Sequence, residues 1–257
     1  MTVGRVVAAA LADAWSLVAP VDCAGCGTPD RALCPDCAPA LRSRLRVAAL
    51  DLGVALGGGH AAAPPLPLTA ALGYEGVTRS VVRALKHEGR TELARVLAPP
   101  LLDAVDAAWR GSGAELLVPV PGSRAGAARR GFGPVALVLR RAGLAAVPLL
   151  RTVAGGPEQK ALRLEQRLAA APRFAAIPRA RGRRVLLVDD VITSGATLRA
   201  AARALREAGA EAVGAAAIAA TPRRRGASSI PWRFLGDEGD GPGDNEPVED
   251  YREGKEA

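Results

Sequence analysis

Aromatic residues are scarce in this 257-residue chain: Phe, Trp and Tyr together make up 3% of it. Aliphatic side chains, chiefly Ala, Val and Leu, must therefore fill the core, and a hydrophobic share of 49% is enough to build one. The chain also lacks the alternation of aromatic and basic residues that platforms for stacking single-stranded nucleic acid use. Composition thus predicts an aliphatic core and gives such a platform little support.

A hydrophobic run long enough to cross a membrane is also missing. The best candidate, residues 6–18, contains Asp13 and is shorter than the roughly 18 apolar residues that a spanning helix needs. No small-residue cleavage pattern indicates a signal peptide. We therefore expect residues 1–20 to form an amphipathic helix packed on the rest of the chain, and the protein to be cytoplasmic, with no membrane span.

Charge is unbalanced toward the basic side, with 34 Lys and Arg against 26 Asp and Glu and a formal net charge of +8. A basic balance suits phosphate-bearing partners such as nucleic acid, but an Ala- and Arg-rich composition also follows from a GC-rich genome. Residues 222–257 pass from Arg223–Arg225 into sequence rich in Gly, Asp and Glu. They contain little to bury, and we expect a disordered tail.

Cysteine is rare, and its four copies lie within fifteen residues. They form two Cys-x-x-Cys pairs, Cys23 with Cys26 and Cys34 with Cys37. Two such pairs can supply four thiolates to one tetrahedral ion, which is the closed coordination of a structural Zn²⁺ site. Disulfides or an iron–sulfur cluster are the alternatives, and the missing secretory signal argues against disulfides. The spacing predicts a four-cysteine zinc finger with a structural role.

Strands and helices alternate along the rest of the chain. Residues 184–189 are apolar without alternation, as in strands of buried parallel sheets. Periodicity predicts further strands over 115–121, 147–150 and 212–219, and helices over 77–87, 92–109, 133–142 and 196–208. This order predicts an α/β fold in which helices flank a parallel sheet.

The sequence VLLVDDVITSGAT, residues 185–197, places Asp189 and Asp190 at the carboxyl end of a predicted strand, where α/β folds bind ligands. Hydroxyls and the N–H groups of a helix N-terminus then follow, and together they can hold a phosphate. The residues concerned are Thr193, Ser194, Gly195, Ala196 and Thr197. Because carboxylates repel phosphate, the aspartates suit vicinal hydroxyls or a Mg²⁺ ion that also holds a polyphosphate. A ribose 5-phosphate bearing a pyrophosphate meets all of these demands.

Three other interpretations of this segment fit less well. A Walker A loop needs a Lys after the glycine, where this chain has Ala196. The phospho-acceptor aspartate of a receiver domain would be expected near the start of its domain, without a hydroxyl-rich loop after it. An aspartate that only caps a helix explains one carboxylate, but not two followed by Thr-Ser-Gly.

The segment closely resembles the phosphoribosyl diphosphate (PRPP) signature of type I phosphoribosyltransferases. With the two cysteine pairs, residues 15–221 resemble the ComF family of competence-associated, phosphoribosyltransferase-like proteins. Further stretches similar to that family are Leu85–Gly89, Val118–Pro121, Arg130–Phe132, Gln159 with Leu162, and Arg167. The chain departs from the family at Gly133–Pro134 and at Ala170, where Asn-Gln and Asn are common.

The resemblance implies a phosphoribosyltransferase-like domain over residues 69–221. A zinc finger over 21–45 and a linker over 46–68 would precede it. Asp189 and Asp190 would then face the ribose hydroxyls, and residues 193–197 would hold the 5-phosphate. A loop with Ser123 and Arg124 would approach the pyrophosphate. From their polar, irregular composition, we further expect residues 155–180 to form a mobile hood that excludes water.

The reaction that this resemblance implies needs positive charge near the pyrophosphate as it leaves, from Mg²⁺ and from basic side chains. The candidates are Lys86, Arg130 and Arg167. We therefore predict a ComF-like protein that binds PRPP with Mg²⁺ and transfers the phosphoribosyl group to an acceptor in nucleotide metabolism or DNA uptake. A PRPP sensor without turnover and an accessory factor for single-stranded DNA, with a competence helicase as partner, are the alternatives. Phe132 is the one aromatic placed to stack a nucleobase.

Overall fold

The computed structural model describes residues 21–53, 64–122, 126, 131–153, 174–222 and 230–235. The helix expected over residues 1–20 and most of the hood expected over 155–180 lie outside these ranges. Within them, no helix is both long and apolar enough to cross a membrane.

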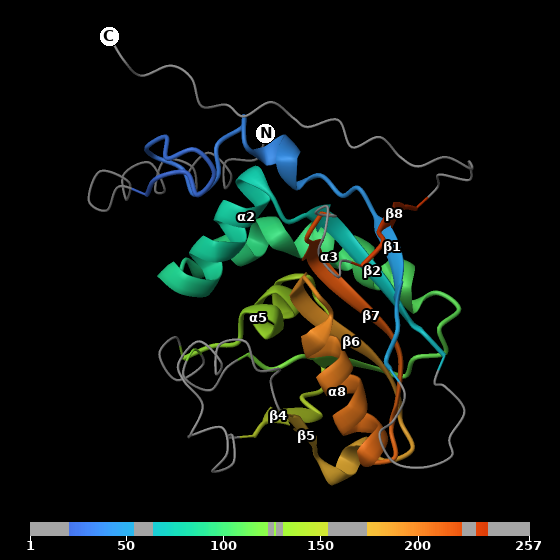
Figure 1. The fold of residues 1–257 in the computed structure, drawn as a ribbon. Helices are drawn as coiled ribbons and strands as arrows, with labels where there is room; N and C mark the ends of the chain where they lie inside the picture. Colours follow the sequence, from blue (N-terminus) through green and yellow to red (C-terminus); the bar gives the residue numbers. More distant parts are fainter. Residues whose placement is uncertain are drawn as a thin grey trace, which may run out of the picture.

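A six-stranded sheet with the order β3-β6-β7-β2-β1-β8 forms the centre of the molecule (Figure 1). Its strands are β1 (Arg46–Leu50), β2 (Leu66–Gly73), β3 (Leu116–Pro119), β6 (Arg184–Ile192), β7 (Glu211–Ala220) and β8 (Arg233–Phe234). The four strands from β3 to β2 run parallel, whereas β1 and β8 are antiparallel to their neighbours. A separate antiparallel pair joins β4 (Leu150–Thr152) to β5 (Phe174–Ala176). The predicted α/β fold with a mainly parallel sheet is confirmed.

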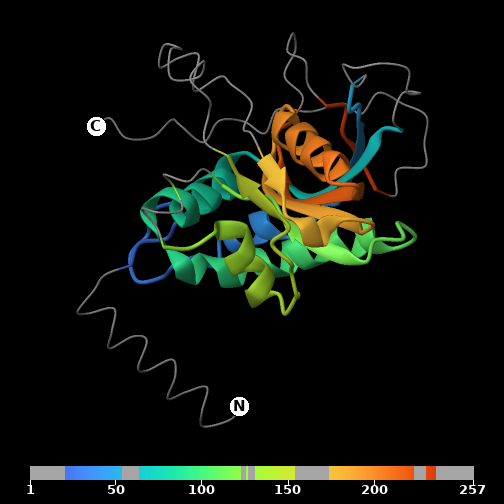
Figure 2. The same cartoon turned by 90° about the horizontal axis from the view of Figure 1, so that it is seen from below.

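Helices cover both faces of this sheet (Figure 2). One face carries α2 (Gly76–Arg83), the π-helical η2 (Ala84–Glu88), η3 (Thr91–Leu93), α3 (Ala94–Trp109) and α5 (Pro134–Arg141). The other face carries α8 (Ala196–Glu207) and the β4–β5 pair. Two short 3-10 turns, η1 (Ala38–Leu41) and η4 (Pro178–Ala180), complete the described elements. The four helices expected from periodicity are thus present at nearly their predicted bounds.

The core divides into two layers because alternate residues of a strand point to opposite faces of the sheet. In β6, Leu186 and Val188 pack toward α3 and α5, whereas Val185 and Leu187 pack toward α8. Buried side chains in the described ranges are almost all Leu, Val, Ala and Ile, and none is aromatic. The aliphatic core expected from composition is therefore confirmed.

Several segments differ from the expectation. Strand β2 was not predicted, and its first residues, 66–68, fall in the expected linker. The strand expected over 147–150 is instead β4, in the separate antiparallel pair and not in the parallel sheet.

Residues 46–50, expected to be part of a linker, form β1 and pair with residues 66–70 of β2. Residues 233–234, expected to lie in a disordered tail, form β8 on the outer edge of β1. Both strands are short and carry arginines, so their own patterns are weak. Pairing with a neighbour that is distant in sequence, rather than local preference, makes them strands.

Candidate active site and metal centre

The two aspartates lie where the edge of the sheet is stepped. Strand β3 ends with Pro119 opposite Val188, so Asp189 and Asp190 extend past it. On its other side β6 stays paired with β7 as far as Ile192, three residues beyond the predicted strand end. This step gives both carboxylates firm backbone support while leaving one side of them uncovered by β3.

Lys86 comes to these aspartates from a different part of the chain. It lies in the π-helical turn η2, which ends at Gly89 in the left-handed region at φ 73°. Its Nζ donates a hydrogen bond to Asp190 Oδ1 at 2.9 Å, although the two residues are 104 positions apart. Single π-turns are uncommon and often occur at functional sites. The structure therefore brings together three of the residues predicted from sequence.

Electrostatics couple this trio of Lys86, Asp189 and Asp190. Burial, reinforced by the negative charge of Asp190, raises the pKa of Asp189 to about 7 from a usual 3.8. The Asp190 N–H, which donates to Asp189 Oδ1 at 2.8 Å, and the charge of Lys86 oppose that rise. Burial lowers the pKa of Lys86, but the charge and hydrogen bond of Asp190 outweigh it, so the net shift is upward. Near neutral pH the site can therefore hold one proton that a cationic ligand would displace.

The loop after β6 has the geometry of a phosphate cradle. Gly195 precedes α8 with φ 75°, a conformation that glycine adopts without strain. A Cβ at this position would lie 2.5 Å from Leu50 Cδ1, so glycine is also required for space. Thr193 and Ser194 are exposed, Ala196 and Thr197 are partly exposed, and the Ala196 N–H donates to Ser194 Oγ at 3.4 Å. No aspartate side chain caps α8, which removes the interpretation of Asp189 or Asp190 as a helix cap.

Four of the predicted site residues, Ser123, Arg124, Arg130 and Arg167, lie outside the described residues. The loop that would carry the first two leaves β3 through Gly122, whose carbonyl accepts a 3.0 Å hydrogen bond from the Thr152 hydroxyl. Arg199 of α8 was not predicted. It donates to the carbonyl of Ser194 within the phosphate loop and to the carbonyl of Asp51, just after β1. Nothing in the sequence marks it, because one Arg among several on the polar face of a helix is ordinary.

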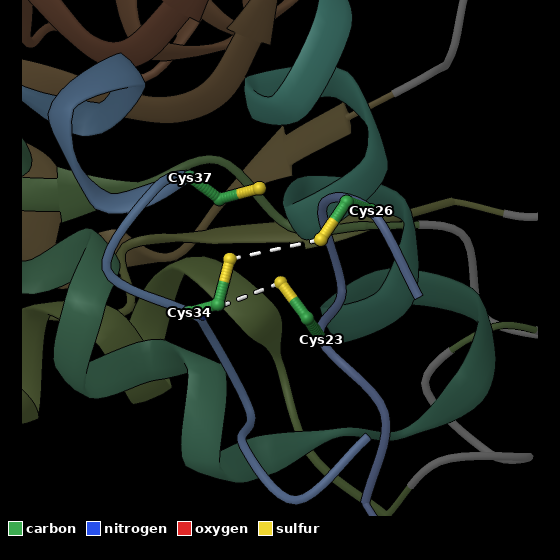
Figure 3. Close-up of side chains that lie close together, drawn as sticks. All are labelled: Cys23, Cys26, Cys34 and Cys37. Atoms are coloured by element: carbon green, nitrogen blue, oxygen red, sulfur yellow. Dashed lines mark hydrogen bonds between the residues drawn. The ribbon is translucent and has the colours of Figure 1, made fainter. Parts of the chain in front are cut away.

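The four cysteines gather at the opposite end of α2 from Lys86, with their sulfurs all within 4.8 Å of one another (Figure 3). Cys26 Sγ and Cys34 Sγ are 3.6 Å apart. This is far longer than a disulfide bond of about 2.05 Å. It is close to the spacing of about 3.8 Å between two sulfurs that each lie about 2.3 Å from a tetrahedral Zn²⁺. The donor set fits zinc, as the spacing predicted.

Backbone donors favour the thiolate form of Cys23 in this cluster. The N–H groups of Cys34 and Gly25 point at Cys23 Sγ at 3.3 and 3.4 Å. Burial raises the pKa of Cys23, but these donors and that of Cys26 outweigh it and leave the pKa at about 6. A thiolate is the form that binds a metal ion.

Gly25 is a second residue that the sequence did not single out. A Cβ there would lie 2.6 Å from Cys37 Sγ and 3.0 Å from Val77 Cγ1 of α2. The cysteine loops therefore pack directly on the first turn of α2, with Val77 and Leu33 against the buried sulfurs. The finger is docked on the helix that leads to Lys86.

Comparison with known proteins shows what the part of the chain that carries the aspartates and the phosphate loop is similar to. Residues 125–249 match the model of the family described as "Phosphoribosyl transferase domain". The chain resembles phosphoribosyltransferases. Adenine phosphoribosyltransferase of Kineococcus radiotolerans is 38% identical over 121 residues, which are 46% of this chain and 60% of that protein. Orotate phosphoribosyltransferase of Streptomyces avermitilis is 42% identical over 65 residues, 23% of this chain and 36% of that protein.

Among solved structures, adenine phosphoribosyltransferase from Rhodothermus marinus has 25% identity and a TM-score of 0.32, over 52% of this chain and 70% of that one. The matched segments span 60% or less of the length of the two curated relatives. The family match includes the aspartates and the whole phosphate loop, and it supports the type I phosphoribosyltransferase family. The cysteine cluster and Lys86 lie outside the matched segment.

Proposed function

We propose that this protein binds PRPP with Mg²⁺ at the carboxyl edge of its sheet and acts as a phosphoribosyltransferase. The observation that carries the proposal is the joining of the Asp189–Asp190 pair, the phosphate loop and Lys86 at one place. The pair and the loop belong to the segment that matches the phosphoribosyl transferase domain. Lys86 adds a cation from outside that segment.

Each group has a distinct role in this proposal. The N–H groups and hydroxyls of residues 193–197 hold the 5-phosphate, helped by the positive end of α8. Asp189 and Asp190 accept hydrogen bonds from the ribose hydroxyls. Mg²⁺, when bound, offsets charge on the pyrophosphate as it leaves. Ser123, Arg124, Arg130 and Arg167 would complete the site around that group.

Lys86 would act on the same developing charge. During transfer the C1–O bond of the ribose breaks, its electron pair leaves with pyrophosphate, and a nitrogen nucleophile forms the new bond to C1. The hydrogen bond to Asp190 fixes the Lys86 ammonium beside the ribose, where it stabilises the negative charge that appears on the departing oxygen.

The test is release of pyrophosphate from PRPP and Mg²⁺ with adenine, with orotate, or with no acceptor, because the relatives are named for the first two. Release that depends on one acceptor supports transfer to that base. PRPP binding without release of pyrophosphate in the presence of either base would favour the sensor hypothesis. Failure to bind PRPP would overturn the proposal.

We also propose that the protein is of ComF type and works in the cytoplasm in DNA uptake. A zinc finger docked on α2, ahead of the phosphoribosyl transferase domain in one chain, supports this. Single-stranded DNA or a competence helicase would then be its partner. Phosphate contacts release counterions, so DNA binding should weaken steeply between about 50 and 200 mM salt. Binding that is absent at low salt, or that does not change with salt, would contradict a DNA partner.

A further inference from the structure

The phosphate loop is supported from behind by two segments from outside the loop. One is β1 with the residues after it, which lie before the matched segment. The other is residues 230–235, which cross the outer edge of β1 as β8 (Figure 1). Both approach the loop at Gly195, the residue immediately before α8.

Contacts at Gly195 show how close these segments come. Seen from the position of a Cβ on this glycine, Leu50 Cδ1 would be 2.5 Å away and Ile230 Cδ1 3.3 Å away. Leu50 is 1% exposed and Ile230 is 6% exposed, and both belong to the core layer beneath α8. The back of the loop is thus a packed hydrophobic seat, closed by one residue from each segment.

Arg199 fastens the loop to this seat. Its Nε donates to the carbonyl of Asp51 at 2.7 Å, and its Nη1 donates to the carbonyl of Ser194 at 2.9 Å. The guanidinium therefore bridges the end of β1 and the phosphate loop with two hydrogen bonds in a fixed fork. Only arginine among the side chains offers that planar pair of donors with a permanent positive charge.

We propose that Arg199 and Ile230 are positioning residues that hold the phosphate loop in its binding conformation. The proposal rests on the proposed function, because it assumes that the loop binds the 5-phosphate. Fixing the carbonyl of Ser194 on the far side of the loop orients the following N–H groups toward the ligand. A loop that is fixed before the ligand arrives loses less freedom on binding, which strengthens affinity.

The probes are ribose 5-phosphate, which needs the loop, and pyrophosphate with Mg²⁺, which does not. Calorimetric titrations would compare Arg199→Gln and Arg199→Lys with the unaltered full chain. We expect both variants to weaken ribose 5-phosphate about tenfold, because each loses the forked bridge and Lys keeps only the charge. Pyrophosphate affinity should stay within about twofold. Ile230→Ala should weaken ribose 5-phosphate about threefold by loosening the seat.

Two matched controls isolate the effect. Arg203→Gln removes an exposed arginine one turn further along α8, and Leu235→Ala removes a side chain that is 53% exposed in the same C-terminal segment. Neither should change either affinity. Thermal unfolding of every variant would identify general destabilisation.

The outcomes separate the two proposals. Selective loss of ribose 5-phosphate binding in both Arg199 variants supports the bridge. Unchanged affinity, equal loss of both ligands, or full recovery by Arg199→Lys would overturn it while leaving the proposed function intact. An unaltered chain that binds neither ligand would overturn the proposed function, and the positioning role with it.

Discussion

The candidate metal centre and the candidate phosphate site are assembled in opposite ways. Four cysteines within fifteen residues form the first, and each pair needs only a tight turn to aim its sulfurs. The second joins Lys86 to Asp190 across 104 positions and rests on strands from both ends of the described chain. Local spacing thus determines one site, and sheet topology determines the other. A substitution at one site should therefore change the binding of that site's ligand and leave the binding at the other site unchanged.

The largest expected effect comes from breaking the metal centre. Cys34→Ser removes a buried ligand, and the three remaining sulfurs cannot close a tetrahedral site. We expect loss of most bound zinc and a stability cost of several kcal/mol, because metal binding and folding of such a loop are coupled. Metal analysis by mass spectrometry and thermal unfolding would measure both.

Thr28→Ala is the control for that change, because it removes a hydroxyl hydrogen-bonded to Cys26 Sγ at 3.1 Å but no sulfur ligand. It should keep its zinc. Retention of full zinc by the Cys34 variant would show that the four sulfurs do not act as one site.

The next largest effect is expected at the candidate phosphate site, from a change of Lys86. Lys86→Ala leaves the Asp190 carboxylate without its ion pair and removes the cation from the site. We expect PRPP affinity to fall at least about tenfold, as for loss of a charged hydrogen bond, while zinc content stays unchanged.

Arg83→Ala, which removes an exposed charge one turn earlier in α2, serves as the matched control and should bind PRPP normally. Equal affinity of the Lys86 and Arg83 variants would mean that the ion pair is structural only.

Gly25 tests how tightly the finger is docked on α2. The methyl group of Gly25→Ala would meet Cys37 Sγ at 2.6 Å, so either the sulfur or α2 has to move. We expect a destabilisation of about 1–3 kcal/mol by overpacking, measured by chemical unfolding, together with weaker zinc binding.

Gly27→Ala separates crowding from backbone strain. Gly27 has φ 79° but open space around its Cβ position, so its variant should lose only about 1 kcal/mol and keep its zinc affinity. Similar zinc affinities in the Gly25 and Gly27 variants would argue against tight docking.

The smallest effect is a pH dependence of stability. Asp189 has a raised pKa of about 7, so between about pH 4 and 7 the folded state binds more protons than the unfolded state. Its contribution to stability therefore falls as pH rises through that window. The Asp189→Asn variant lacks this titrating group, so it does not lose that stability as pH rises. The unfolding temperature of the variant minus that of the unaltered protein should therefore be a few degrees larger at pH 8 than at pH 5.

Asp106→Asn, on the exposed side of α3, controls for the general effect of removing an acid. Calorimetric scans at the two pH values would measure all three proteins. Parallel pH profiles for the Asp189 variant and the unaltered protein would contradict the raised pKa.

Much of this molecule is predictable from sequence where the signal is local. Spacing predicted the cysteine cluster, and apolar patterns predicted three of the four parallel strands and the helices that cover them. The family resemblance made Lys86 a candidate near the pyrophosphate, but its pairing with Asp190 was not predicted, since nothing local links residues so far apart. Strands β1 and β8, and with them Arg199, could not be predicted, because each depends on a neighbour that only the folded sheet brings close.

The central claim is that Asp189, Asp190 and the phosphate loop form a PRPP site. Its most direct test is calorimetric titration of PRPP with Mg²⁺ into the unaltered protein and into the Asp189→Asn/Asp190→Asn double variant. Micromolar binding that disappears in the double variant, while its zinc content is unchanged, is the predicted result. Absence of binding by the unaltered protein, or equal binding by both, would contradict the claim.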